Sequence, residues 1–271
     1  MNFSEKLEQA VQKNKSLLCV GLDPDPQRIP DNLGVFEFNK AIIDATSDLV
    51  CAYKPNLAFY EALGDEGLDA LKQTVKHIPG NIPVIADAKR NDIGNTAKAY
   101  ATAIFSVLNF DAVTVNPYLG FDSVEPFIEY RDKGIFILCR TSNPGSADFQ
   151  SLRCRFEKGY RPLFEIVAAR ASQWNTTGNV GLVVGATFPE ELKLIRQQHP
   201  DMTILIPGVG AQGGDIGLAV SYGIDASGRG IIINSSRQVL YASSGKDFAR
   251  AARLAASELR DEINQHVSTR T

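Results

Sequence analysis

Eight short apolar runs, alternating with helical patterns, constrain the fold of this 271-residue chain more than any other feature. The runs are rich in Val, Ile and Leu with little polar interruption, which is typical of parallel strands that are buried on both faces. They cover residues 16–23, 50–56, 82–89, 111–118, 134–141, 180–187, 202–209 and 230–237. Amphipathic segments lie between them, and a strong helical pattern at 246–266 follows the last run. This alternation predicts an α/β fold, a single (β/α)₈ TIM barrel over residues 1–271.

A doubly wound open sheet is the alternative architecture for the same order of strands and helices. The first run continues as GLDPDPQR, without the G-x-G-x-x-G sequence of dinucleotide-binding folds, and this favours the barrel. The connection after the fifth run, from Ser142 to about Pro162, shows no regular pattern. A connection of this length is often a lid over a functional site, and a tolerated surface insertion is the other interpretation.

The charge balance excludes some classes of partner. The chain has 28 Lys and Arg against 31 Asp and Glu, so it lacks the basic surface that nucleic-acid binding requires.

The N-terminal segment has no apolar stretch typical of a signal peptide, and the apolar runs are too short to span a bilayer. The four cysteines show no C-x-x-C spacing, which is typical of buried, reduced thiols. We therefore expect a cytoplasmic protein without a membrane partner.

Charged side chains stand at the carboxyl ends of the second and third runs, where TIM barrels place their active sites. Asp87 and Lys89 are two residues apart, so an extended strand would direct both into the barrel lumen. Lys54 ends the second run and can reach the same place, and Asp92 follows in the next loop. A structural ion-pair cluster is the alternative, because confined opposite charges need to pair. Four such groups at adjacent strand ends indicate a functional site.

A second group of polar residues follows the seventh and eighth runs, where barrels commonly bind phosphate. The segment PGVGAQGGD at 207–215 offers backbone N–H groups and the amide of Gln212, and NSSR at 234–237 ends in Arg237. A glycine-rich turn with a surface arginine is the alternative interpretation. All three histidines fall in or at the ends of predicted helices, so neither histidine catalysis nor a histidine-bound metal is expected.

Three segments resemble the orotidine 5′-phosphate decarboxylase family: DAKRNDIGNTA at 87–97, AYKPN at 52–56 and IPGVGAQGGD at 206–215. The resemblance extends over nearly the whole chain, and NSSR in place of the family's Gly-Arg phosphate motif is similar to its longer branch. The sequence departs from the family pattern at Asn91 and Asn95, where Gly and Ser are expected. Asparagine tolerates the left-handed backbone that a glycine at that place could need.

The resemblance implies the cofactor-free, metal-free decarboxylation of orotidine 5′-phosphate to uridine 5′-phosphate in pyrimidine biosynthesis. It implies that Lys89 protonates C6 as carbon dioxide leaves, while Asp87 lies against the substrate carboxylate. Lys54 and Asp92 would complete a hydrogen-bonded array of charges with them. It also implies a homodimer with shared active sites, in which Asp92, Ile93 and Thr96 reach into the partner's site.

The remaining implied roles concern substrate binding. Asp23 and Lys54 would bind the ribose hydroxyls, and Ser142 would contact the amide edge of the pyrimidine. Gln212, Arg237 and the backbone amide of Ser236 would hold the phosphate. The candidate substrate-binding residues are therefore Asp23, Thr96, Ser142, Pro207, Gln212, Ser236 and Arg237.

Two other functions remain open from the sequence. A sugar-phosphate decarboxylase or aldolase of the same barrel superfamily would share an aspartate–lysine–aspartate motif but would need Mg²⁺. A non-catalytic module that senses a nucleotide phosphate would keep the phosphate-binding segments and lack turnover. The presence of all four charged residues, together with Ser142 and the NSSR segment, favours the decarboxylase.

Overall fold

Each of the eight apolar runs contains one strand of a single parallel sheet in the computed structural model, which describes residues 1–209 and 213–269. The strands are β1 (Leu18–Leu22), β2 (Ala52–Pro55), β3 (Ile85–Arg90), β4 (Ala112–Val115), β5 (Gly134–Arg140), β8 (Val180–Val184), β9 (Ile204–Pro207) and β10 (Ile231–Ser235). Their order in the sheet is β2-β1-β10-β9-β8-β5-β4-β3. The two end strands meet through isolated parallel bridges, Tyr53 with Val84 and Asn56 with Asp87. The sheet therefore closes, which confirms the predicted TIM barrel over the open sheet.

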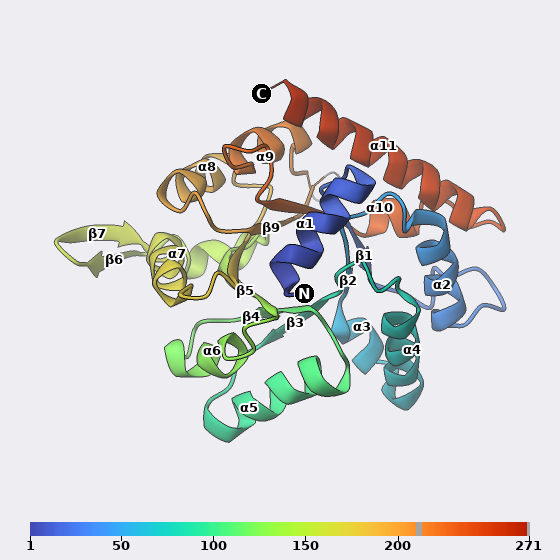
Figure 1. Cartoon of the computed structure of the whole chain (residues 1–271), viewed down its shortest axis with the longest axis horizontal. Helices are drawn as coiled ribbons and strands as arrows, with labels where there is room; N and C mark the ends of the chain where they lie inside the picture. Colours follow the sequence, from blue (N-terminus) through green and yellow to red (C-terminus); the bar gives the residue numbers. More distant parts are fainter. Residues whose placement is uncertain (210–212, 270–271) are drawn as a thin grey trace.

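Helices surround this barrel on the outside (Figure 1). The longer ones are α2 (Val35–Thr46), α4 (Gly64–His77), α5 (Gly94–Thr102), α6 (Phe121–Ile128), α7 (Leu163–Trp174), α8 (Pro189–Gln198), α9 (Ile216–Gly223) and α11 (Phe248–Ser268). Short helices α3 (Leu57–Glu61) and α10 (Arg237–Leu240) follow β2 and β10 directly, and a π-helical turn (Ala103–Val107) extends α5. Among the described residues, no helix combines the length and apolar character that crossing a bilayer would require.

The first helix, α1 (Phe3–Asn14), closes one end of the barrel (Figure 1). Phe3 and Leu7 pack there against a layer of inward-facing side chains, and the Phe3 ring meets the edge of Phe136 at a centroid distance of 5.7 Å. The layer takes one residue from each strand: Cys19, Ala52, Ile85, Ala112, Phe136, Val183, Leu205 and Ile232. Because the backbone N–H of Phe3 bonds to the carbonyl of Asp132, just before β5, α1 covers the amino ends of the strands. The carboxyl ends remain open.

The connection after β5 has more structure than the sequence analysis predicted. A 3₁₀ turn (Pro144–Asp148) is followed by a two-stranded antiparallel hairpin of β6 (Arg153–Phe156) and β7 (Gly159–Pro162). The prediction of an irregular stretch was wrong here because both strands are only four residues long, mostly polar and partly or fully exposed, so they carry little apolar signal. Glu157 takes the left-handed backbone of the turn, with a φ of 51°. The hairpin projects outward beside α7 (Figure 1).

The four cysteines are all free thiols, and they differ in their exposure to solvent. Cys19, Cys51 and Cys139 are buried and Cys154, on the hairpin, is partly exposed. Burial raises the pKa of the Cys19 thiol to about 12, and it also raises the pKa of Cys51 and Cys139 well above the usual value. Since the thiolate is the reactive form, the three buried sulfurs are inert.

We expect a thiol reagent such as Ellman's reagent to titrate one fast thiol in the native protein and four after denaturation. The Cys154→Ser variant should show no fast thiol and three after denaturation. Two or more fast thiols in the native protein would contradict the burial of the barrel cysteines.

Candidate active site

A cavity of about 600 Å³ opens at the carboxyl ends of the barrel strands. Its floor lies one layer above the apolar layer that α1 seals, because inward-facing residues of a strand recur every two positions. The corresponding side chains are those of Lys54, Asp87, Thr114, Leu138, Pro207 and Asn234. Two residues further along the strands, the wholly apolar layer is thus followed by one in which four of these six side chains are polar.

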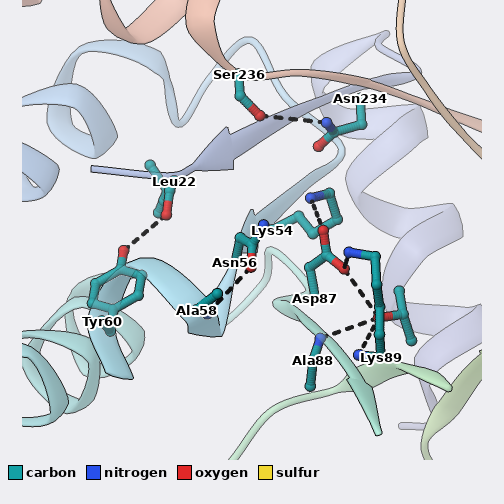
Figure 2. A network of polar contacts seen from close by, with 11 residues as sticks. Leu22, Lys54, Asn56, Ala58, Tyr60, Asp87, Ala88, Lys89, Asn234 and Ser236 are labelled. Carbon is teal, nitrogen blue, oxygen red and sulfur yellow. Dashed lines mark hydrogen bonds and ion pairs between the residues drawn. The ribbon is translucent and has the colours of Figure 1, made fainter. Parts of the chain in front are cut away.

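Three charged residues form a compact cluster on this floor (Figure 2). Asp87 lies between the two lysines. Its Oδ2 atom is 2.9 Å from Lys54 Nζ, and its Oδ1 atom is 2.5 Å from Lys89 Nζ. The side chain of Lys54 is 5% exposed, whereas that of Lys89 is 49% exposed. Lys54 therefore anchors the carboxylate from below, and the Lys89 ammonium faces the open cavity.

The pairing fixes the protonation states of the cluster. Burial alone would raise the pKa of Asp87, but the nearby charges of Lys54 and Lys89 outweigh it and hold this pKa far below the usual value. Burial would likewise lower the pKa of Lys54, but the carboxylates of Asp87 and Asp23 outweigh it and raise this pKa. At neutral pH, Asp87 is ionised and Lys54 is protonated.

The backbone of β3 is irregular where it carries these residues. The pairing with β4 shifts between Ala86 and Arg90, and Lys89 has a φ of 46°, in the left-handed region. The two side chains do meet, as the sequence analysis expected. They meet through this irregular backbone, and not because a regular extended strand directs both to one side. Asn91, where the resemblance predicts a glycine, is not among the residues with a positive φ, and it donates a side-chain hydrogen bond to the carbonyl oxygen of Asn116.

The opposite side of the cavity carries groups suited to an anionic ligand. Arg237 lines the opening and forms no ion pair with any described residue, and Ser236 lies beside it. Gly21 makes room for Ser236, since a Cβ atom at residue 21 would lie 1.9 Å from the serine Oγ. Pro207 lines the same side of the cavity. The fifth candidate on this side, Gln212, lies outside the described residues.

Two further candidates present unpartnered buried oxygen atoms. Asp23 Oδ1 and Ser142 Oγ are inaccessible to solvent and have no hydrogen-bond partner among the described residues, and both residues line the cavity. Gly185 leaves space for Ser142, because a Cβ atom there would lie 2.2 Å from the serine Oγ. Buried polar atoms without partners are rare in folded proteins, so these two oxygens are positioned to meet a ligand.

Asp92 and Thr96 are absent from the cavity lining, so this chain does not bring them to its own cluster. Asp92 accepts a hydrogen bond from the backbone N–H of Ile93, and Ile93 is 54% exposed. Thr96 is exposed on the first turn of α5. Asp92 is partly exposed and Ile93 and Thr96 are exposed, and none of the three lines the cavity of this chain.

The lining also includes residues that the sequence analysis did not select. Thr114 and Asn234 sit on the floor, and Tyr241 and Arg28 lie at the opening. The Tyr241 hydroxyl donates to the carbonyl of Asp23 and accepts from the N–H of Asp25, which holds the loop after β1. The sequence feature that could have identified Thr114 as a lining residue is a single hydroxyl at an inward-facing position of an otherwise apolar strand.

The connection after β5 reaches the cavity through Thr141, Ser142 and Asn143, whereas the β6–β7 hairpin does not contribute to the described lining. No cluster of three or more His, Cys, Asp and Glu side chains in the described ranges has the spacing of a metal site.

We expect Asp87→Asn to lower the free energy of unfolding by about 3 kcal/mol at pH 7, because it leaves the buried Lys54 charge without its partner. The folded-state pKa of Asp87 lies below the ordinary value of 3.8, so its stabilisation is complete above pH 3.8 and is lost as the pH falls below it. Urea denaturation should therefore show a constant difference from wild type between pH 7 and pH 5, shrinking below pH 4. The surface variant Asp44→Asn should lose less than about 1 kcal/mol. A difference for Asp87→Asn that persists unchanged at the lowest accessible pH would contradict the assigned pairing.

Comparisons with known proteins agree with this geometry. The family model described as "Orotidine 5'-phosphate decarboxylase / HUMPS family" matches residues 16–252. An orotidine 5′-phosphate decarboxylase from Dehalococcoides mccartyi is 56% identical over 266 residues, which cover 98% of each chain. The solved structure of Leishmania donovani OMP decarboxylase has a TM-score of 0.86 and 42% identity over 99% of each chain. That of L. donovani UMP synthase has a TM-score of 0.88 and 44% identity over 98% of this chain and 57% of that one. The chain therefore belongs to the orotidine 5′-phosphate decarboxylase / HUMPS family.

Proposed function

We propose that this chain decarboxylates orotidine 5′-phosphate to uridine 5′-phosphate and that Lys89 is the proton donor. The single observation that carries the proposal is the Lys54–Asp87–Lys89 cluster on the floor of the cavity. Family membership supports the same reaction and does not favour the Mg²⁺-dependent or the non-catalytic alternative. Conversion of orotidine 5′-phosphate by the purified protein in the presence of EDTA tests it directly.

The cluster suits the chemistry of this reaction. When the bond between C6 and the carboxylate breaks, carbon dioxide leaves and the electron pair stays on a ring carbon without an adjacent electron sink. The ammonium of Lys89 stabilises that charge because it is already fixed beside the carbon, and it then transfers its proton to C6. Asp87 lies against the departing carboxylate and holds the ammonium in place through its 2.5 Å contact. Lys54 keeps Asp87 ionised throughout.

The rest of the cavity would bind the parts of the nucleotide that do not react. Arg237 and the backbone amide of Ser236 hold the phosphate, with Pro207 beside them and Gln212 as a further donor. Phosphate binding contributes to the rate although it is remote from the broken bond, because it orders the site around the ring. The ribose hydroxyls bind Asp23 and Lys54, and Ser142 binds the amide edge of the pyrimidine. The unpartnered oxygens of Asp23 and Ser142 support these two roles.

We also propose a homodimer in which each chain completes the other's site. Asp92, Ile93 and Thr96 do not line the cavity of their own chain and remain accessible, as residues lent to a partner would. Large apolar side chains are exposed around the same rim, namely Phe59, Ile93, Tyr118, Leu119 and Phe121. Exposed apolar patches of this kind commonly mark protein interfaces. Because the four thiols are free, we propose that the dimer works in the reducing environment of the cytoplasm.

We expect Lys89→Ala to lower kcat by far more than tenfold while uridine 5′-phosphate still binds. The lysine supplies both the proton and a positive charge that the transition state uses more fully than the ground state does. Turnover and product titration by calorimetry measure the two effects, and Lys76→Ala on the surface of α4 is the matched control. Retention of more than about a tenth of wild-type kcat, a barrier change of only ~1.4 kcal/mol, would exclude Lys89 as the proton donor.

We expect Lys89→Ala and Asp92→Ala homodimers to be nearly inactive, and their mixture to recover activity after subunit exchange. In a mixed dimer, both substitutions fall in one site and the other site is wholly wild type. Random exchange makes about half of the dimers mixed, so activity should return to about a quarter of the wild-type value. Exchange confirmed by native mass spectrometry without any recovery would mean that each site is built from one chain.

A further inference from the structure

We propose that the hydroxyl of Thr114 is a positioning group that holds the Lys89 backbone in its left-handed conformation and thereby aims the Lys89 ammonium. Thr114 touches Asp87 and the main chain of β3, and its effect on the reaction passes through Lys89. The inference rests on the proposed role of Lys89 as proton donor. It concerns how the fold keeps that group in place.

The register between β3 and β4 creates the need for such a group. Ala86 pairs with Val113 and Arg90 pairs with Val115, so three residues of β3 face the single residue Thr114 on β4. The intervening stretch, residues 87–89, cannot continue the regular ladder of backbone hydrogen bonds with β4. The N–H groups there are partly buried and need another acceptor, since leaving them unpaired destabilises the fold.

The Thr114 hydroxyl supplies that acceptor. Its Oγ1 atom accepts hydrogen bonds from the backbone N–H of Ala88 at 3.1 Å and of Lys89 at 3.0 Å. The hydroxyl proton is donated to Asp87 Oδ1 at 3.1 Å, the same oxygen that contacts Lys89 Nζ. A hydroxyl offers one donor and two acceptor positions, so all its hydrogen-bonding capacity is used. One oxygen atom therefore joins the backbone of the irregular stretch to the carboxylate of the charge cluster.

The position requires the hydroxyl more than it requires the volume of the side chain. Thr114 is 2% exposed, and its neighbours Val113 and Val115 show that β4 accepts branched apolar residues. A valine at residue 114 would fill nearly the same space and leave both N–H groups of residues 88 and 89 without an acceptor. A lysine at a φ of 46° occupies a sparsely populated backbone conformation, which persists only while its surroundings enforce it.

The test compares Thr114→Val with Thr114→Ser. The valine variant should lose about tenfold to a hundredfold in kcat, which corresponds to the free-energy penalty of leaving polar groups unpaired. Its affinity for uridine 5′-phosphate should stay within about threefold of the wild-type value. The serine variant keeps the oxygen and should stay within about threefold of wild-type kcat. A purely structural threonine would instead affect both variants alike, or affect binding and turnover together.

Thr74→Val is the matched control, because Thr74 is also buried and accepts a hydrogen bond from Asn39 Nδ2, and neither residue lines the cavity. It should lower the melting temperature and leave kcat unchanged. If Thr114→Val does not fold, as judged by circular dichroism, Thr114→Cys replaces it. Sulfur is a weak acceptor, so kcat of the cysteine variant should lie well below that of the serine variant.

Wild-type kcat in the valine or cysteine variant, or equal losses in the serine and valine variants, would overturn the inference. Failure of the wild-type protein to convert orotidine 5′-phosphate would be a different result, because it would refute the proposed function itself. The two failures are separated by measuring wild type and variants in the same assay.

Discussion

The pairing of one buried carboxylate with two lysines is the interaction on which the rest of this site depends. Asp87 is 12% exposed and its charge is tolerated because Lys54 lies below it and Lys89 beside it. Removing charges from water is costly, and the cost is met only when each charge keeps its partners. The barrel supplies Lys54 from the neighbouring strand β2 and Lys89 from β3 itself, both above an apolar layer. The cluster therefore depends on the closure of the sheet, which brings β2 next to β3.

Much of this arrangement could be predicted from the sequence because the strands are continuous apolar runs and the polar residues stand where these runs end. All eight strands were found in this way, and Lys54, Asp87, Lys89, Asp23 and Ser142 meet in one cavity. The local distortion of β3 could not be predicted, since its cause lies in the pairing with β4. A left-handed lysine has no signature in the sequence of residues 85–90. Thr114, which bonds to the backbone of Lys89, stands between two valines, and nothing in this sequence marks it as that partner.

Other differences between the sequence predictions and the structure lie in the segments that connect the barrel strands. The β6–β7 hairpin is short and polar, so its alternation is too weak to separate it from a loop. The placement of Asp92 and Thr96 outside the cavity lining depends on how α5 begins after Ile93, a detail that residue spacing does not contain. Spacing along the chain predicts which residues share a strand end. It does not predict which side of the rim a loop residue faces.

The closure of the amino end of the barrel by α1 determines from which side molecules reach the cavity. Because Phe3 and Leu7 close the amino end of the barrel, the described residues leave the cavity open on the side of the carboxyl ends. Under the proposed function, the nucleotide would enter and leave on this side, and the water that restores the proton of Lys89 would arrive by the same route. Carbon dioxide would form beside Asp87, on the cavity floor. As a small neutral molecule it would leave without breaking an ionic contact, whereas the nucleotide would first have to release its phosphate from Arg237.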